Sequence, residues 1–193
     1  RNPVLMLSDG AIGQMMEKVE FKPYTKPHTD KFWATTGKPK NRERNYITSL
    51  FIQPERMEVH NLKLEEKFKQ IRENEVRFEE SKTEDAEYLL VAYGLSARIS
   101  LKAIDLLREK GIKAGLLRPI TLYPYPSARI HALAGQMKKI LCVELNAGQM
   151  VEDVRLAVNG QIPVDFFGRM GGLMPTPESI AQYLETLIQD QHD

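Results

Sequence analysis

Two short runs of this chain are apolar at nearly every position, and they limit the possible folds more than any other feature. They lie at residues 88–93 and 140–145, and each is followed by a segment with apolar residues at helical spacing. A strand that is apolar on both faces has to be covered on both faces, which is typical of a parallel sheet between helices. Strands that alternate with helices also predict parallel strands joined by right-handed crossovers.

The neighbouring segments continue the same pattern. Further strands are expected at residues 113–117 and 164–167, and the alternating segment 76–80 is expected to be an antiparallel edge strand. Helices are expected at 61–75, 96–110, 127–139, 149–158 and from Thr176 onward. The sequence therefore predicts the α/β class, as a three-layer α/β/α sandwich around a mainly parallel five-stranded sheet with one antiparallel edge strand.

The first 60 residues do not follow this pattern. Strands are expected at residues 4–8 and 46–52, with a short helix at 12–16. Between Glu17 and Arg44, prolines break the periodicity and basic residues outnumber acidic ones, which predicts a linker or an extended arm. The arm is interpreted either as solvated or as a docking segment for an acidic protein or a phosphate-rich cofactor. A core strand so near the start of the sequence favours a fragment of a longer protein.

Composition excludes several function classes. Hydrophobic residues make up 42% and charged residues 27% of the chain, and the net charge is +1, so we expect neither nucleic acid nor a membrane as partner. Cys142 is the one cysteine, which excludes an intramolecular disulfide and fits a reducing, cytoplasmic compartment. The four histidines are scattered, so no metal site is predicted. No catalytic constellation is recognisable, so we expect no catalytic residue on this chain.

Two strand-end turns are candidate sites. Gly94 and Ser96 join a strand to a helix, where backbone N–H groups and the helix dipole can bind an anion, or where Ser96 only caps the helix. Asn146 and Gln149 match a local capping box, in which Asn146 caps the helix and Gln149 bonds back to its backbone. The other reading is that Asn146, Gly148 and Gln149 meet a ligand or a partner subunit at the carboxyl end of a central strand.

Arg118 also follows a strand. Its guanidinium is suited to bidentate binding of a carboxylate or phosphate, and the alternative is a structural ion pair with Glu144 or Asp165. Cys142 is expected to be buried and inert. The loop at 171–175 is either a contact surface or the lead-in to the last helix.

Five stretches together resemble the α subunit of 2-oxoacid:ferredoxin oxidoreductases, most closely the 2-oxoisovalerate (branched-chain) and 2-oxoglutarate members. They read PVLMLSDGAIGQMME, LLVAYGLSARI, GLLRPITLYPYP, VELNAGQMVEDVRLAVNG and FFGRMGGLMPTPESI. The resemblance implies that residues 1–16 end a pyrimidine-binding domain, that 17–60 form a linker or arm, and that 61–193 form a domain like the transketolase C-terminal domain.

The resemblance also implies an activity. Members of the family oxidatively decarboxylate a 2-oxoacid with coenzyme A to acyl-CoA and carbon dioxide, and reduce ferredoxin. The holoenzyme is expected to use thiamine diphosphate, Mg, an iron–sulfur cluster and coenzyme A, none of them held by this chain alone. Expected partners are the β and γ/δ subunits, ferredoxin through the holoenzyme, and a second copy of the chain.

On this interpretation the chain is a scaffold and interface domain. Arg118, Asn146, Gly148 and Gln149 are expected to face the subunit junction, with Gly94 and Ser96 as further candidates. A stand-alone module that binds an anion or nucleotide at the Gly94 or Asn146 turn is the alternative.

Overall fold

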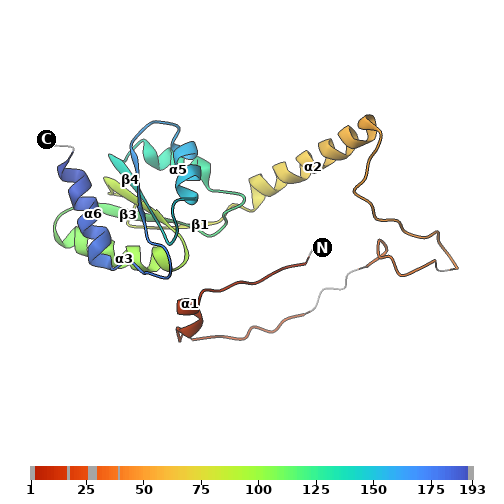
Figure 1. Cartoon of the computed structure of the whole chain (residues 1–193), viewed down its shortest axis with the longest axis horizontal. Coiled ribbons are helices and arrows are strands. Elements are labelled where there is room, and N and C mark those ends of the chain that lie inside the picture. The colour runs from red at the N-terminus through yellow and green to blue at the C-terminus, as the bar shows by residue number, and fades with distance from the viewer. Residues whose placement is uncertain (1–2, 17, 26–29, 39, 191–193) are drawn as a thin grey trace. The chain divides into compact units, whose positions relative to one another are not determined.

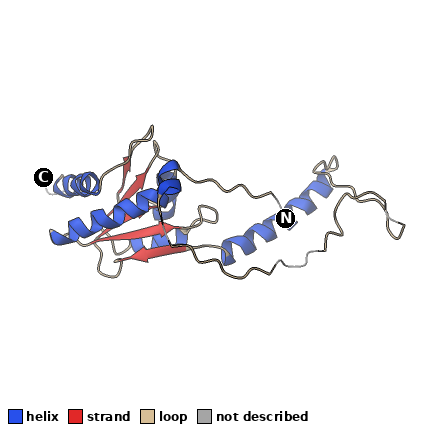
Figure 2. Cartoon of the chain, turned by 90° about the horizontal axis from the view of Figure 1, so that it is seen from below, coloured by secondary structure: helices blue, strands red, loops and turns tan. Residues whose placement is uncertain are grey.

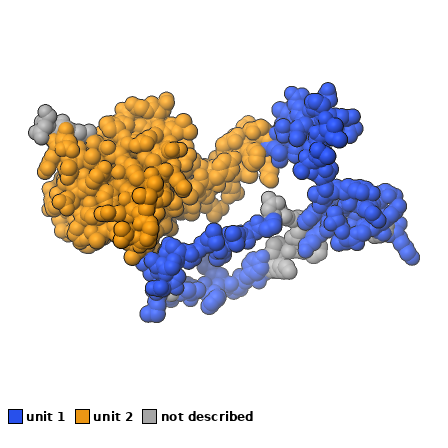
Figure 3. Space-filling view, viewed as in Figure 1, with its two compact units in different colours: residues 1–64 blue, residues 65–193 orange. Residues whose placement is uncertain are grey.

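The computed structural model describes residues 3–16, 18–25, 30–38 and 40–190. The chain divides into two compact units, Arg1–Leu64 and Glu65–Asp193, which are coloured separately in Figure 3. The predicted boundaries after residues 16 and 60 stay a prediction. In the described part of the chain, no helix combines the length and the apolar character that a membrane span requires.

The second unit is built on the predicted five-stranded sheet. Its strands are β1 (Phe78–Ser81), β2 (Tyr88–Ala92), β3 (Ala114–Pro119), β4 (Lys139–Glu144) and β5 (Val164–Gly168). Their order in the sheet is β1-β3-β2-β4-β5. β1 pairs antiparallel with β3, whereas the other three pairings are parallel. The predicted fold class, with one antiparallel edge strand, is confirmed.

Helices cover both faces of this sheet (Figures 1 and 2). On one face, α3 (Gly94–Glu109) and α6 (Pro177–Gln189) pack on strand residues such as Leu90 and Leu141. On the other, α4 (Ser127–Ala134) and α5 (Met150–Val158) pack on residues such as Leu89 and Cys142. Successive strand residues point to opposite faces, so each apolar run supplies both layers of the core.

Local caps fix one end of two of these helices. Thr176 and Ser179 form a reciprocal capping box at the start of α6, with Pro177 in the first turn. Gly111 follows α3 at φ +80°, and the Ile112 N–H donates to the Leu107 carbonyl at 3.0 Å. That bond is the signature of a left-handed glycine C-cap.

The first unit differs from prediction. Residues 4–8 and 46–52 are not strands, because no neighbouring strand pairs with them among the described residues. α1 is Gly10–Gln14, capped by the Asp9 side chain, which accepts from the Ile12 N–H at 2.8 Å. α2 runs from Pro54 to Asn74 across the unit boundary, and none of its residues is buried. It begins earlier than predicted because proline is well tolerated in the first turn of a helix.

Candidate functional site

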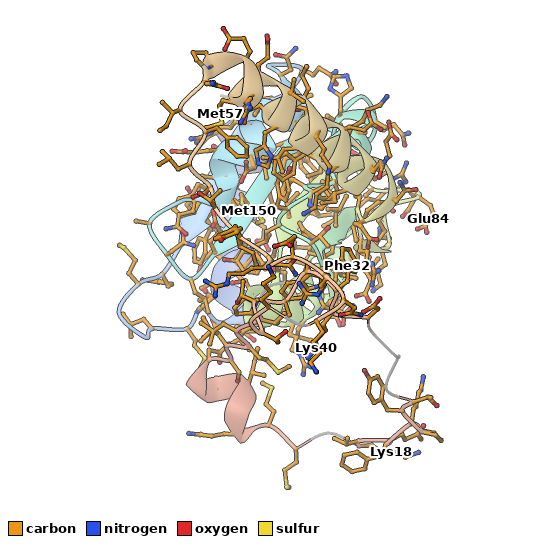
Figure 4. The ribbon with its side chains drawn as sticks, turned by 90° about the vertical axis from the view of Figure 1, so that its right-hand side faces the viewer. Lys18, Phe32, Lys40, Met57, Glu84 and Met150 are labelled. Atoms are coloured by element: carbon orange, nitrogen blue, oxygen red, sulfur yellow. The ribbon has the colours of Figure 1, made fainter. Side chains whose placement is uncertain are left out.

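The carboxyl ends of β2 and β4 meet at a topological switch point. These two strands are neighbours, but α3 carries the chain from β2 to β3 on one side and α5 carries it from β4 to β5 on the other. Open α/β sheets bind ligands where adjacent strands diverge in this way. Met150, which is labelled in Figure 4, is the first residue of α5.

A buried carboxylate occupies the β4 side of the switch point. Glu144 ends β4, and only 1% of its surface is exposed. Its two oxygens accept from the backbone N–H groups of Met150 at 2.9 Å, Val151 at 3.0 Å and Gln149 at 3.3 Å. The first N–H groups of a helix have no partner within the helix and carry a partial positive charge. Glu144 therefore caps α5 from within the protein.

Asn146 holds the loop between β4 and α5. Its Nδ2 donates to Glu144 Oε2 at 3.0 Å, and its Oδ1 accepts from the Gly148 N–H at 2.7 Å. Gly148 has φ +105°, which a side chain rarely adopts, and a Cβ there would lie 3.2 Å from Val151 Cγ1. Gln149 is the residue before α5 and makes no side-chain cap. The predicted box between Asn146 and Gln149 is therefore wrong, because the carboxylate of Glu144 takes its place.

The neighbouring strand clamps the same loop. A Cβ on Gly168, the last residue of β5, would lie 2.5 Å from the Asn146 carbonyl oxygen. The Arg169 N–H donates to the Glu144 carbonyl at 3.2 Å. The loop is therefore fixed from both sides, by α5 and by β5.

The ionisable groups near Glu144 are held in their neutral forms. Burial raises the pKa of the Cys142 thiol, and the negative charge of Glu144 raises it further. Burial and the Glu144 charge likewise raise the pKa of Tyr93, and burial raises that of Tyr125. Cys142 is buried, as predicted. These groups provide no activated nucleophile.

The β2 side of the switch point has a different turn. Gly94, at φ +56°, is the first residue of α3, and Tyr93 before it makes no side-chain cap. Ser96 is buried in the first turn, so the predicted capping by Ser96 is wrong. The helix begins two residues earlier than predicted because Gly94 supplies the left-handed backbone that the turn requires.

Arg118 lies apart from these turns, on β3. Its guanidinium donates to Glu79 at 2.9 Å, the residue opposite it in the antiparallel pair. The alternative of a structural ion pair is therefore observed, but the partners expected for it, Glu144 and Asp165, are wrong, because they lie two and three strands away. Asp165 is paired with Lys139 at 2.9 Å instead. Arg118 and Glu79 also line a cavity of about 150 Å³ beside α3.

The structure therefore brings Asn146, Gly148 and Gln149 together in one loop beside the Gly94 turn, and leaves Arg118 on the far side of β2. Whether these positions face a partner stays a prediction. Among the described residues, there is no group of three or more His, Cys, Asp or Glu side chains placed to hold a metal ion. The sequence did not point to Glu144 as the central residue, because the N–H groups that donate to its carboxylate lie five to seven residues further along the chain.

Comparison with known proteins identifies relatives of this fold. Residues 86–180 match the family described as pyruvate:ferredoxin oxidoreductase core domain II. The whole chain aligns, at 41% identity, with 54% of the ketoisovalerate oxidoreductase subunit VorB of Methanothermobacter thermautotrophicus. The chain belongs to the 2-oxoacid:ferredoxin oxidoreductase family. The resemblance seen in the sequence is confirmed.

The chain is also similar to 2-oxoglutarate synthase subunits. The 2-oxoglutarate synthase subunit KorA of the same organism is 35% identical over 102 residues, 53% of this chain and 27% of the relative. The chain spans about half the length of the VorB subunits it matches. A solved 2-oxoglutarate:ferredoxin oxidoreductase from Magnetococcus marinus shares the fold, with a TM-score of 0.59 at 22% identity over 70% of this chain and 24% of that chain.

Proposed function

We propose that this chain is the C-terminal part of the α subunit of a 2-oxoacid:ferredoxin oxidoreductase that acts on 2-oxoisovalerate. The enzyme would convert the 2-oxoacid and coenzyme A to acyl-CoA and carbon dioxide, and pass the electrons to ferredoxin. The alignment of the whole chain with a ketoisovalerate oxidoreductase subunit at 41% identity carries this proposal. The 2-oxoglutarate synthase subunits align with 53–95% of the chain at the lower identities of 26–35%.

Within that enzyme the chain acts as a scaffold and interface domain. Thiamine diphosphate, Mg, the iron–sulfur cluster and coenzyme A would be held by other parts of the complex. The switch point does not fit a magnesium–diphosphate site, because both oxygens of Glu144 already accept from N–H groups. The neutral thiol of Cys142 and phenols of Tyr93 and Tyr125 also support a role without covalent chemistry.

The assembled enzyme provides the test. A complex purified through a tag on this chain should contain β and γ/δ subunits and reduce an electron-acceptor dye in a reaction that requires coenzyme A. We expect the highest kcat/KM with 2-oxoisovalerate, compared with 2-oxoglutarate and pyruvate. A complex without coenzyme A-dependent turnover would exclude the proposed activity, and a preference for 2-oxoglutarate would correct the substrate.

A stand-alone module for an anion or nucleotide is the second candidate. The observation that favours it is the absence of a side-chain cap at the Gly94 end of α3. At the Asn146 turn the negative charge of the buried Glu144 disfavours the binding of an anionic ligand. Calorimetry of the isolated chain with coenzyme A and nucleotides distinguishes the two functions: micromolar binding supports the module, and no binding, together with association to a β subunit, supports the interface domain.

A further inference from the structure

The loops after β4 and β5 expose an apolar patch. Leu145 follows β4, and Met170, Leu173 and Met174 follow β5. The three residues after β5 are 56–66% exposed. The two loops adjoin, since Glu144 pairs with Gly168 in the sheet. Exposed apolar patches of this kind mark sites of contact with other macromolecules.

The loop after β5 is shaped to present these side chains. Gly171 and Gly172 both have positive φ, and the Leu173 N–H donates to the Met170 carbonyl at 3.3 Å. Pro175 is buried and leads into the capping box of α6. The loop is therefore anchored at its far end, while its apolar side chains point away from the core.

Arg169, which precedes Met170 in the chain, adds a cation next to this patch. Arg169 is exposed, and its guanidinium lies 5.7 Å from the centre of the Phe167 ring. Among the described residues, no carboxylate pairs with it and no acceptor receives a hydrogen bond from its side chain. Its backbone N–H donates to the Glu144 carbonyl at 3.2 Å, which holds the Arg169 backbone beside the end of β4. A desolvated guanidinium needs a carboxylate partner to be stable in an interface.

We propose that Leu145, Arg169, Met170, Leu173 and Met174, the β5-edge patch, dock another subunit that presents a carboxylate surrounded by apolar side chains. The proposal rests on the function proposed above, because it names the surface through which the interface domain binds. A second copy of the chain is a poorer occupant, since a two-fold contact centred on the patch would bring the two Arg169 guanidiniums together. Leucine and methionine can adapt to a partner surface, and arginine is frequent among the residues that dominate binding energy.

The test compares patch variants with matched controls in the assembled complex. Arg169→Glu and Leu173→Ser should each weaken association with the docked subunit by about tenfold or more. Arg155→Glu and Leu156→Ser are the controls, because both residues are exposed on α5 outside the patch, Leu156 at 78%. The controls should bind like wild type, and all four variants should unfold at the wild-type urea concentration. Cross-linking from the patch identifies the facing carboxylate, and its exchange for lysine should restore binding to Arg169→Glu.

The outcomes separate this proposal from the proposed function. Wild-type binding by both patch variants, in a complex that assembles and turns over 2-oxoacid, would overturn the docking surface and leave the function standing. A wild-type chain that associates with no oxidoreductase subunit would overturn both. A self-associating chain that becomes monomeric with Leu173→Ser would assign the patch to a second copy and overturn the heterologous partner.

Discussion

The amino ends of the parallel strands, here called the amino edge, and their carboxyl ends, the carboxyl edge, are built in opposite ways. At the amino ends of the parallel strands, ion pairs join different elements and close the edge. They are Lys82–Asp105 at 2.6 Å, Arg108–Asp85 at 2.7 Å, Lys110–Glu185 at 2.6 Å and Lys138–Glu87. At the carboxyl ends, one buried carboxylate, Glu144, satisfies the loop from inside, and apolar side chains face outward.

This difference separates an edge whose charges are paired within the chain from an edge whose exposed side chains are free to contact another molecule. Every charge named at the amino edge finds its partner within the chain, so that edge has little left to offer another molecule. At the carboxyl edge Glu144 and Asn146 are hydrogen-bonded within the chain. The exposed side chains there include the apolar Leu145, Met170, Leu173 and Met174 and the cation of Arg169, which forms no ion pair with another described residue. Exposed ion pairs contribute little to stability, whereas a buried and fully bonded carboxylate contributes much. The carboxyl edge should therefore be sensitive to mutation, and the amino edge tolerant.

The largest effect is expected at Glu144. Glu144→Ala leaves the N–H groups of Gln149, Met150 and Val151 and the Asn146 amide without an acceptor. It should lower the free energy of unfolding by about 3 kcal/mol or more. Glu144→Gln keeps the shape and one acceptor oxygen, so its loss should be smaller. Urea unfolding of the full chain measures both. A loss below about 1 kcal/mol for Glu144→Ala would mean that the carboxylate does not hold this edge.

A second large effect is expected at Gly168. Gly168→Ala places a Cβ 2.5 Å from the Asn146 carbonyl oxygen and against the Phe166 ring, and should cost about 2 kcal/mol. Gly94→Ala is the matched control, because its φ is +56° but no atom lies within 4 Å of the added Cβ. It should cost about 1 kcal/mol, from backbone strain alone. Equal costs in the same urea titration would argue against the clamp between β5 and the Asn146 loop.

Intermediate effects are expected where the sequence predicted a subunit junction. In the assembled complex, Arg118→Ala and Asn146→Ala should weaken assembly or raise the KM for coenzyme A by about three- to tenfold. Arg118→Lys tests whether charge alone suffices, because lysine cannot make the same bidentate contact. Each variant's unfolding is measured alongside, since Asn146 also holds the β4–α5 loop. Unchanged assembly and kinetics in both alanine variants would remove these residues from the junction.

The smallest effect is expected from acid at the amino edge. Hydrogen bonds from Arg108, Lys138 and Lys82 lower the pKa values of Asp85, Glu87 and Asp105 respectively. A lowered folded-state pKa adds stability above the unfolded-state pKa, and that stability is lost as the pH falls through the folded-state pKa. Urea midpoints should therefore decline slightly as the pH drops below about 4. Lys138→Met should reduce the part of this pH dependence that comes from Glu87. If the urea midpoint of the variant depends on pH as that of the wild type does, the Lys138–Glu87 pair does not contribute to stability.

The sequence predicts the central sheet well, because a strand with apolar residues on both faces leaves few alternatives. The runs that became β2 and β4 needed no knowledge of the rest of the chain. Residues 4–8 carry a similar apolar signal, but a strand also needs a neighbour to pair with, and pattern alone does not supply one.

The site was less predictable, because its contacts are not local. Asn146 and Gln149 match a local capping pattern, but Glu144 reaches the same N–H groups from the end of the preceding strand. The partner of Arg118 depends on β1 lying beside β3, and the order of elements along the chain does not fix the order of strands in the sheet. The loop at 171–175 was recognised from its sequence, and the exposure of Leu173 and Met174 in the structure now favours a contact surface over a simple connection.

The internal cap of α5 has a consequence for selectivity. In many proteins of this topology, the amino end of a helix at the switch point attracts phosphate groups. Here the carboxylate of Glu144 already accepts from the N–H groups at that end. A dinucleotide or ATP that diffuses to this helix end would meet repulsion, so abundant metabolites would not compete with a protein partner for the neighbouring surface.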